Sequence, residues 1–166
     1  MMTQPAPTRS TAPMQRAAQV ACALAMLVLA ACSKVDPDAP PDLAYGQDIC
    51  AQCSMIVSDE RFACALIVQQ DDGAFATLAF DDIGDMAQYE ARKPALPIHK
   101  RWVHDYDTGA WLLAQDAYFT RSTNLQTPMG SGVAAHASRD ESAAFARKHA
   151  TNGKVMRWSD LVDAGR

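Results

Sequence analysis

The sequence predicts an α+β fold in which two ββαβ units repeat within one compact domain. The first observation is the order strand, strand, helix, strand in the first half of the globular part, and the second is the same order in the second half. The third is that the two helices begin in register when residues 79–82 are aligned with residues 135–138. Because the aligned residues differ, we predict an approximate duplication of structure rather than of sequence.

Two apolar runs on either side of a turn open the first unit. Asp71-Asp72-Gly73 separates them, and Asp-Gly between apolar runs is typical of a β-hairpin. Asp81 or Asp82 then caps a stretch whose apolar residues fall at helical spacing. The elements expected are strands at 61–70, 75–80 and 101–106, with a helix before the third strand that ends ahead of Pro94.

The second unit begins with a longer apolar run that is interrupted at Gln115-Asp116. Ser138 and Glu141 form a capping box for the helix that follows, and Asn152-Gly153 ends this helix. A short final helix is expected with Ser159 as its cap. The elements expected are strands at 111–120, 133–137 and 154–158 and a helix from 138 to 149.

Residues 1–31 have the composition of a bacterial lipoprotein signal peptide. Arg9 and Arg16 precede an apolar run that is shorter than the ~20 residues of a membrane-spanning helix. The run ends in the lipobox Leu29-Ala30-Ala31-Cys32, so we expect cleavage before Cys32 and acylation of this cysteine. The lipid would anchor the chain on the periplasmic face of a bacterial membrane, and Ser33 favours the outer membrane. An ordinary signal peptide with an incidental cysteine is the alternative.

Residues 32–47 are expected to form a flexible tether, and residues 48–166 the folded domain. Three prolines among Asp and Ala give the tether a composition that stays extended and solvated. Residues 1–31 carry two of the 15 basic residues and none of the 19 acidic ones, so 13 basic and 19 acidic residues remain, a formal charge of −6. This balance excludes nucleic acid as a partner, because phosphate binding needs a basic surface.

Two thiols and a thioether lie close together in the run Cys50-Ala51-Gln52-Cys53-Ser54-Met55. Thiolate and thioether sulfur favour Cu(I), whereas a structural zinc site takes four nitrogen or thiolate ligands. The pattern Cys-x-x-Cys also occurs in thiol-disulfide oxidoreductases, which is the alternative function. Such an enzyme needs a lowered thiol pKa, usually from a helix N-terminus, but the run leads into apolar and β-branched residues that favour a loop or strand.

Cys53 and Met55 are the first candidate copper ligands, because they share one short loop. Cys50 is either a further ligand or the disulfide partner of Cys53. If that disulfide forms, both thiolates are lost and metal loading requires prior reduction.

Three further residues are candidates outside this run. Met129 lies between Pro128 and Gly130 in a loop, where a large apolar side chain has no evident packing role. His136 follows this loop, and its imidazole would complete a sulfur-rich site. Met86 lies on the inward face of the first helix, where a methionine more often fills the core than binds a metal.

Four motifs in succession resemble those of the NosL family, copper-binding lipoproteins that accompany nitrous oxide reductase. They are CAQCSMIVSD at 50–59, FDDIGDM at 80–86, WVHDY at 102–106 and TPMGSG at 127–132. The resemblance implies paired ββαβ units and a periplasmic Cu(I) chaperone that helps to assemble the copper-sulfide centre of the reductase with an ABC-type maturation apparatus. Ser54 stands where the family usually has Gly, and serine adopts a positive φ only at a cost.

Overall fold

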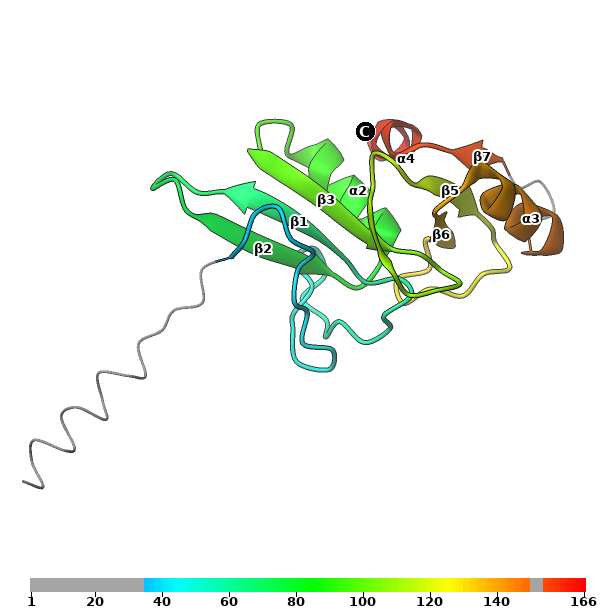
Figure 1. Ribbon diagram of the computed structural model, residues 1–166, viewed down its shortest axis with the longest axis horizontal. Helices are drawn as coiled ribbons and strands as arrows, with labels where there is room; N and C mark the ends of the chain where they lie inside the picture. Colours follow the sequence, from blue (N-terminus) through cyan, green and yellow to red (C-terminus); the bar gives the residue numbers. More distant parts are fainter. Residues whose placement is uncertain (1–34, 150–153) are drawn as a thin grey trace, which may run out of the picture. The chain divides into compact units, whose positions relative to one another are not determined.

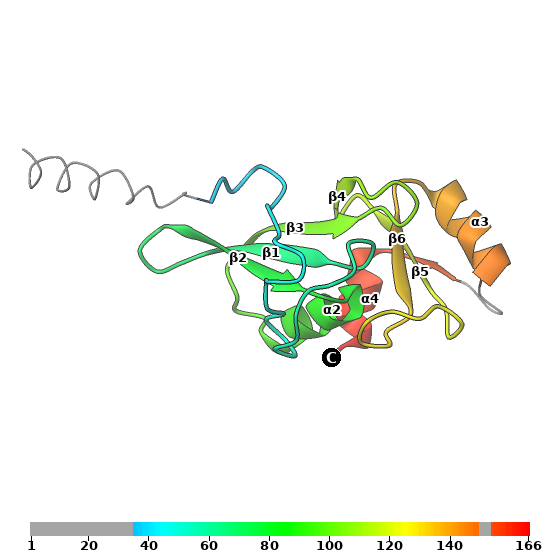
Figure 2. The same cartoon turned by 90° about the horizontal axis from the view of Figure 1, so that it is seen from below.

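The computed structural model of the protein describes residues 35–149 and 154–166. These residues form two antiparallel sheets and three helices (Figures 1 and 2). The signal peptide, the lipobox at Cys32 and the helix stop at Asn152-Gly153 lie outside the described residues. Within the described ranges, no helix combines the length and the apolar character that crossing a membrane requires.

The first unit contains the strands and helix expected from its sequence. In chain order it consists of β1 (Cys64–Gln69), β2 (Phe75–Phe80), α2 (Ile83–Arg92) and β3 (Ile98–His104). β1 lies in the middle of the sheet, antiparallel to β2 on one side and to β3 on the other. A short strand, β4 (Trp111–Leu113), pairs with the outer edge of β3. The sheet therefore has the order β2-β1-β3-β4.

The second unit repeats this arrangement. Its elements are β5 (Tyr118–Arg121), β6 (Val133–His136), α3 (Arg139–His149) and β7 (Val155–Met156). Its sheet has the order β6-β5-β7, with the first strand again in the middle and both neighbours antiparallel to it. The predicted duplication of two ββαβ units is thus confirmed. A last helix, α4 (Trp158–Ala164), packs against α2, and Figure 2 shows both helices on the same face of the first sheet.

The helix caps were predicted correctly for α2 and α3. The Asp82 carboxylate accepts a hydrogen bond from the Gly84 backbone N–H at 2.8 Å, which satisfies one of the free N–H groups of the first turn. At α3 the Ser138 hydroxyl accepts from the Glu141 N–H at 3.2 Å, and the Glu141 carboxylate accepts from the Ser138 N–H at 2.9 Å. This is the capping box that the sequence indicated.

Several element boundaries differ from the prediction: the first strand begins at Cys64 rather than at 61, and the third strand ends at His104 rather than at 106. The third strand begins at Ile98 rather than at 101, because its pairing with β1 continues to Val68. The run 111–120 divides into β4 and β5 at the Gln115-Asp116 interruption. The last strand is only Val155–Met156, and Trp158 belongs to α4.

Ser159 does not cap α4, contrary to the prediction. The cap is Arg157, whose backbone N–H donates to the Asp160 carboxylate at 2.8 Å. The Arg157 guanidinium also donates to the backbone carbonyls of Gln115 and Asp116, which ties the start of the helix to the turn between β4 and β5. These contacts are long-range, so the local sequence did not indicate them.

Packing against the domain begins before Asp48, so the described part of the predicted tether is not free of the domain. Leu43 is buried in the core, and the Tyr45 hydroxyl lies 2.8 Å from His104 Nε2. Asp38 approaches Lys100 Nζ at 3.4 Å. Residues 37–39 bend and residues 45–47 form a turn, so this part of the segment follows the surface of the domain instead of extending from it.

Candidate metal site

The two cysteines of the sulfur-rich run lie on a tight hairpin. Ile49 and Ile56 pair as an antiparallel bridge, and the Cys50 N–H donates to the Met55 carbonyl at 2.8 Å. The Ala51 N–H donates to the Ala79 carbonyl at 2.8 Å, which attaches the hairpin to the end of β2. The tip of the hairpin is therefore held where β2 leads into α2.

Ser54 closes this hairpin in a left-handed conformation. Its φ is +63°, and it is the one non-glycine residue with positive φ in the described part of the chain. Its N–H donates to the Cys50 carbonyl at 2.9 Å. A left-handed φ costs an L-residue other than glycine about 1–2 kcal/mol. Ser54 thus adopts here the conformation that glycine, usual at this position in the family, reaches without that cost.

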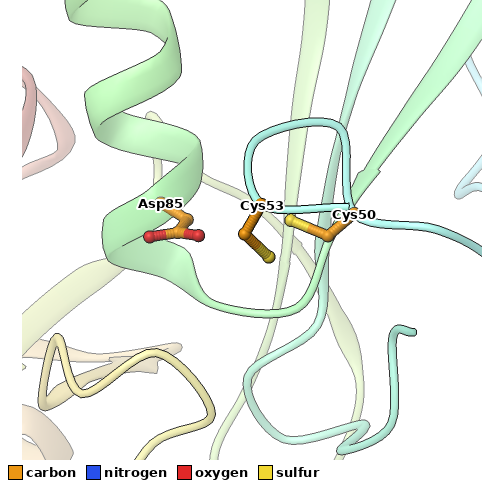
Figure 3. Close-up of side chains that lie close together, drawn as sticks. All are labelled: Cys50, Cys53 and Asp85. Carbon is orange, nitrogen blue, oxygen red and sulfur yellow. The ribbon is translucent and has the colours of Figure 1, made fainter. Parts of the chain in front are cut away.

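The hairpin brings both thiols next to a carboxylate of α2. The sulfur atoms of Cys50 and Cys53 and one carboxylate oxygen of Asp85 all lie within 4.8 Å of one another. Figure 3 shows Cys53 between Cys50 and Asp85. Cys50 is buried and Cys53 is half-buried, and neither forms a disulfide. In the described ranges this is the one cluster of three or more His, Cys, Asp or Glu side chains with such close ligand atoms.

The environment raises the pKa of two groups in this cluster, Cys53 and Asp85. Burial raises the pKa of the Cys53 thiol; a hydrogen bond from the Met55 backbone opposes the rise, and Cys50 and Asp85 add to it. Burial also raises the pKa of Asp85, with a further contribution from the charge of Asp82. A raised thiol pKa is the reverse of what a thiol-disulfide oxidoreductase needs.

A second loop, residues 127–131, is fastened to the start of α2. The buried Asp82 carboxylate accepts hydrogen bonds from the Thr127 hydroxyl at 2.6 Å, from the Met129 N–H at 3.1 Å, and from the Ser131 N–H and hydroxyl. Gly84 lets the loop approach, because a Cβ there would overlap Ser131 Cβ. The loop that carries Met129 is thus tied to the helical turn that carries Asp85.

The structure places the predicted ligands in three different surroundings. Cys50, Cys53 and Met55 share the hairpin, and Met55 is exposed. Met129 is exposed on the loop bound to Asp82. Met86 is completely buried in the core cluster that also contains Cys50, as expected of a core-filling side chain.

His136 lies apart from the thiol cluster. Its ring is packed 4.9 Å from that of Phe145 on α3 and 6.2 Å from that of Tyr106. Neither ring nitrogen has a hydrogen-bond partner among the described residues, and Nδ1 is 3.8 Å from Asp107 Oδ2. Burial lowers the pKa of His136. The structure therefore does not bring this imidazole together with the thiols.

Asp85 is the site residue that the sequence analysis did not single out. It lies three residues after the helix cap, and this position could have placed it on the first turn of α2. Its proximity to the thiols depends on the packing of the hairpin against α2, which no local pattern indicates. One of its oxygens, Oδ2, is buried without a hydrogen-bond partner in the described chain.

The donor set suits a soft metal ion. Two thiols and one exposed thioether share the hairpin, and a second exposed thioether lies on a loop held at the neighbouring helix turn. Sulfur ligands of this kind prefer Cu(I), and the cluster lacks the four nitrogen or thiolate donors of a structural zinc site.

Comparison with known proteins shows the family and the fold of the chain. The sequence model of the NosL family matches residues 44–164. The fold is similar to that of the copper chaperone NosL from Shewanella denitrificans, with a TM-score of 0.59 and 16% identity over 75% of this chain and 99% of that chain. No curated protein matches the sequence. The predicted family resemblance is confirmed, and the chain belongs to the NosL family.

Proposed function

We propose that this protein is a metallochaperone that binds Cu(I) through Cys50, Cys53, Met55 and Met129 and passes the ion to another protein. The proposal rests on one observation. The thiols of Cys50 and Cys53 lie within 4.8 Å of each other on one hairpin, and the same hairpin carries the exposed thioether of Met55. Membership of the NosL family and the similarity in fold to a copper chaperone support it.

The graded exposure of the sulfur atoms suits transfer by ligand exchange. Cys50 is buried, Cys53 is half-buried, and Met55 and Met129 are exposed. Cu(I) is satisfied by few soft ligands, so an incoming ligand can replace a thioether while a thiolate still holds the ion. Both thiols must lose their protons on binding, and the Asp85 carboxylate lies close enough to accept one.

The cellular setting follows from the predicted lipobox and from the family. In this proposal Cys32 is acylated, and the chain is anchored to the periplasmic face of a bacterial membrane, most simply the outer membrane. The copper is used for the copper-sulfide centre of nitrous oxide reductase, which is assembled with an ABC-type maturation apparatus.

The test is an anaerobic titration of the reduced full chain, in detergent, with Cu(I) and a competing chelator. We expect one tightly bound ion, loss of tight binding in Cys53→Ser and weaker binding in Met55→Leu. Cys64→Ala and Met156→Leu are matched controls, because they remove a thiol and a thioether outside the site. Equal binding by Cys53→Ser and the unmodified protein contradicts the proposal.

A thiol-disulfide oxidoreductase remains the second candidate because two free thiols lie close together. The raised pKa of Cys53 weighs against it. Reduction of insulin disulfides by the full chain, with equal rates in Met55→Leu, supports the enzyme; copper binding that depends on Met55, without disulfide reduction, supports the carrier.

A further inference from the structure

The exposed large apolar side chains gather around the metal site. In residues 35–149 and 154–166 there are five such side chains, between 37% and 54% exposed: Tyr45, Ile49, Met55, Ile56 and Met129. Ile49, Met55 and Ile56 belong to the hairpin and Met129 to the loop bound to Asp82, while Tyr45 lies in the turn before the hairpin, which is bonded to Val57. Single exposed apolar residues need no explanation, but their restriction to one site marks an interaction surface.

The hairpin geometry puts two of these side chains on one face. Ile49 and Ile56 are cross-strand partners, and opposite residues of an antiparallel pair project to the same side. Cys50, which follows Ile49, and Val57, which follows Ile56, are buried and project to the other side. Met55, which precedes Ile56 and lies opposite Cys50, also projects to that side but is exposed. The outer face of the hairpin is therefore apolar, and its two isoleucines directly adjoin the candidate ligands Cys50 and Met55.

The segments on either side of the hairpin are acidic. Residues 35–60 contain six acidic residues and no lysine or arginine: Asp36, Asp38, Asp42, Asp48, Asp59 and Glu60. Two of them are balanced by ion pairs, Asp38 with Lys100 and Asp59 with Arg61. Asp42 and Asp48 line a hollow of about 220 Å³ together with Ile49. Negative charge thus borders the apolar face.

We propose that the outer face of the hairpin, formed by Ile49 and Ile56, is the docking surface for the protein that receives the copper, together with the exposed side chains of Met55, Met129 and Tyr45. The receiver is expected to present an apolar patch bordered by lysine or arginine, complementary to this acidic rim. This inference rests on the proposed function and adds the chemistry of the partner.

Charge distinguishes a protein receiver from the other occupants of such a face. A second copy of the chain would bring one acidic rim against another, and like charges across an interface are unfavourable. A bacterial membrane surface is anionic and repels the rim in the same way. Only a cationic partner gains from both the apolar contact and the charge.

The experiment measures Cu(I) transfer from the full chain in detergent to two receivers, the purified ABC-type maturation complex and the copper-free reductase. The double variant Ile49→Ser/Ile56→Ser should keep the Cu(I) affinity that is measured against a chelator. It should slow transfer about tenfold or more, because about half of each isoleucine side chain is exposed in the free protein and would be buried by the receiver. Added salt should slow transfer by the unmodified chain, because it screens the rim.

A charge-reversal pair tests the rim separately. Asp42→Lys should slow transfer, whereas Asp71→Lys should not. Asp71 is also exposed, but it lies in the turn at the opposite end of β2 from the hairpin contact at Ala79. A strand of this length spans about 20 Å, so the control changes the same charge away from the site.

Several results overturn the inference. Unchanged transfer by the double isoleucine variant with intact Cu(I) affinity places the docking surface elsewhere. Transfer by the unmodified chain to neither receiver removes a protein receiver from the inference. A dimer in sedimentation that the double variant abolishes assigns the face to a second copy. Protection of amides 45–56 from hydrogen exchange by phosphatidylethanolamine–phosphatidylglycerol vesicles assigns it to the membrane. Failure of the unmodified chain to bind Cu(I) is a different result, which removes the proposed function itself.

Discussion

Asp82→Asn should release the Met129 loop while leaving the helix cap in place. Asp82 is completely buried, and its two oxygens have different partners. Oδ1 accepts from the Gly84 N–H and the Ser131 hydroxyl, and Oδ2 accepts from the Thr127 hydroxyl and the Met129 N–H. Asparagine caps helices as well as aspartate, so its oxygen can take the Oδ1 role. Its amide group then faces the Met129 N–H and cannot accept from it.

The expected cost follows from these partners. A hydrogen bond to a buried charged group is worth about 1.5–3 kcal/mol, so the free energy of unfolding should fall by about 2–3 kcal/mol. The Thr127 hydroxyl can rotate and donate elsewhere, which limits the loss. If the loop is released, the Met129 side chain must be immobilised again when the metal binds, and this loss of conformational entropy costs about 0.5–1.5 kcal/mol. Cu(I) affinity should therefore fall about 3- to 10-fold.

The neighbouring Asp81 provides a matched control. It is also buried, but its hydrogen bonds, from the Ser58 N–H at 2.8 Å and the Ser58 hydroxyl, go to Oδ1 alone. Asp81→Asn retains that oxygen and should change stability and affinity far less. Urea unfolding of the metal-free reduced chain and chelator competition measure the two quantities. If Asp82→Asn costs no more than Asp81→Asn, the carboxylate does not hold the loop.

Four further predictions test the same structure by urea unfolding and copper competition. Gly84→Ala should destabilise the chain despite alanine's helix preference of about 1 kcal/mol, because its Cβ meets Ser131; a gain in stability refutes the close contact. Ser54→Gly should raise the free energy of unfolding by about 0.5–1 kcal/mol and retain copper binding. The gain is the cost of the left-handed φ that glycine removes, minus the extra conformational entropy of glycine in the unfolded chain; a lower free energy of unfolding contradicts the strain at Ser54. His136→Phe should gain about 1 kcal/mol by removing two unpaired nitrogens, with unchanged Cu(I) affinity; weaker copper binding places His136 among the ligands. Burial lowers the pKa of both His104 and His136, so below pH 6.5 the unfolded chain binds more protons than the folded chain. The free energy of unfolding should therefore decrease as the pH is lowered below 6.5, and it should decrease less steeply in His136→Phe.

Features set by residues a few positions apart could be predicted from the sequence. The Asp71-Asp72-Gly73 turn and the Asp82 cap each depend on hydrogen bonds within four residues, and both are present. The start of β3 at Ile98 depends on pairing with β1. The start of α4 combines a local cap bond from the Arg157 N–H to Asp160 with long-range contacts of the Arg157 guanidinium to the β4–β5 turn. Such long-range contacts leave little trace in the local pattern.

The same distinction applies to the site. Cys50, Cys53 and Met55 lie together because six residues of one hairpin carry them. His136 was expected near Met129 because the two are close in sequence. However, β6 runs from Val133, beside the loop, to His136 under α3, and three strand steps cover about 10 Å. Closeness in sequence was therefore a poor guide along an extended strand.

The duplicated units show how Asp85 becomes available to the thiols. Asp82 and Ser138 occupy the cap position of their helices, so Asp85 in α2 corresponds to Glu141 in α3. Glu141 bonds back to the N–H of its own cap residue, which completes the capping box. Asp85 has one methylene fewer, has no such bond, and lies beside Cys50 and Cys53 instead. A position that stabilises the helix in one unit thus faces the metal site in the other, because the hairpin packs at only one of the two strand–helix junctions.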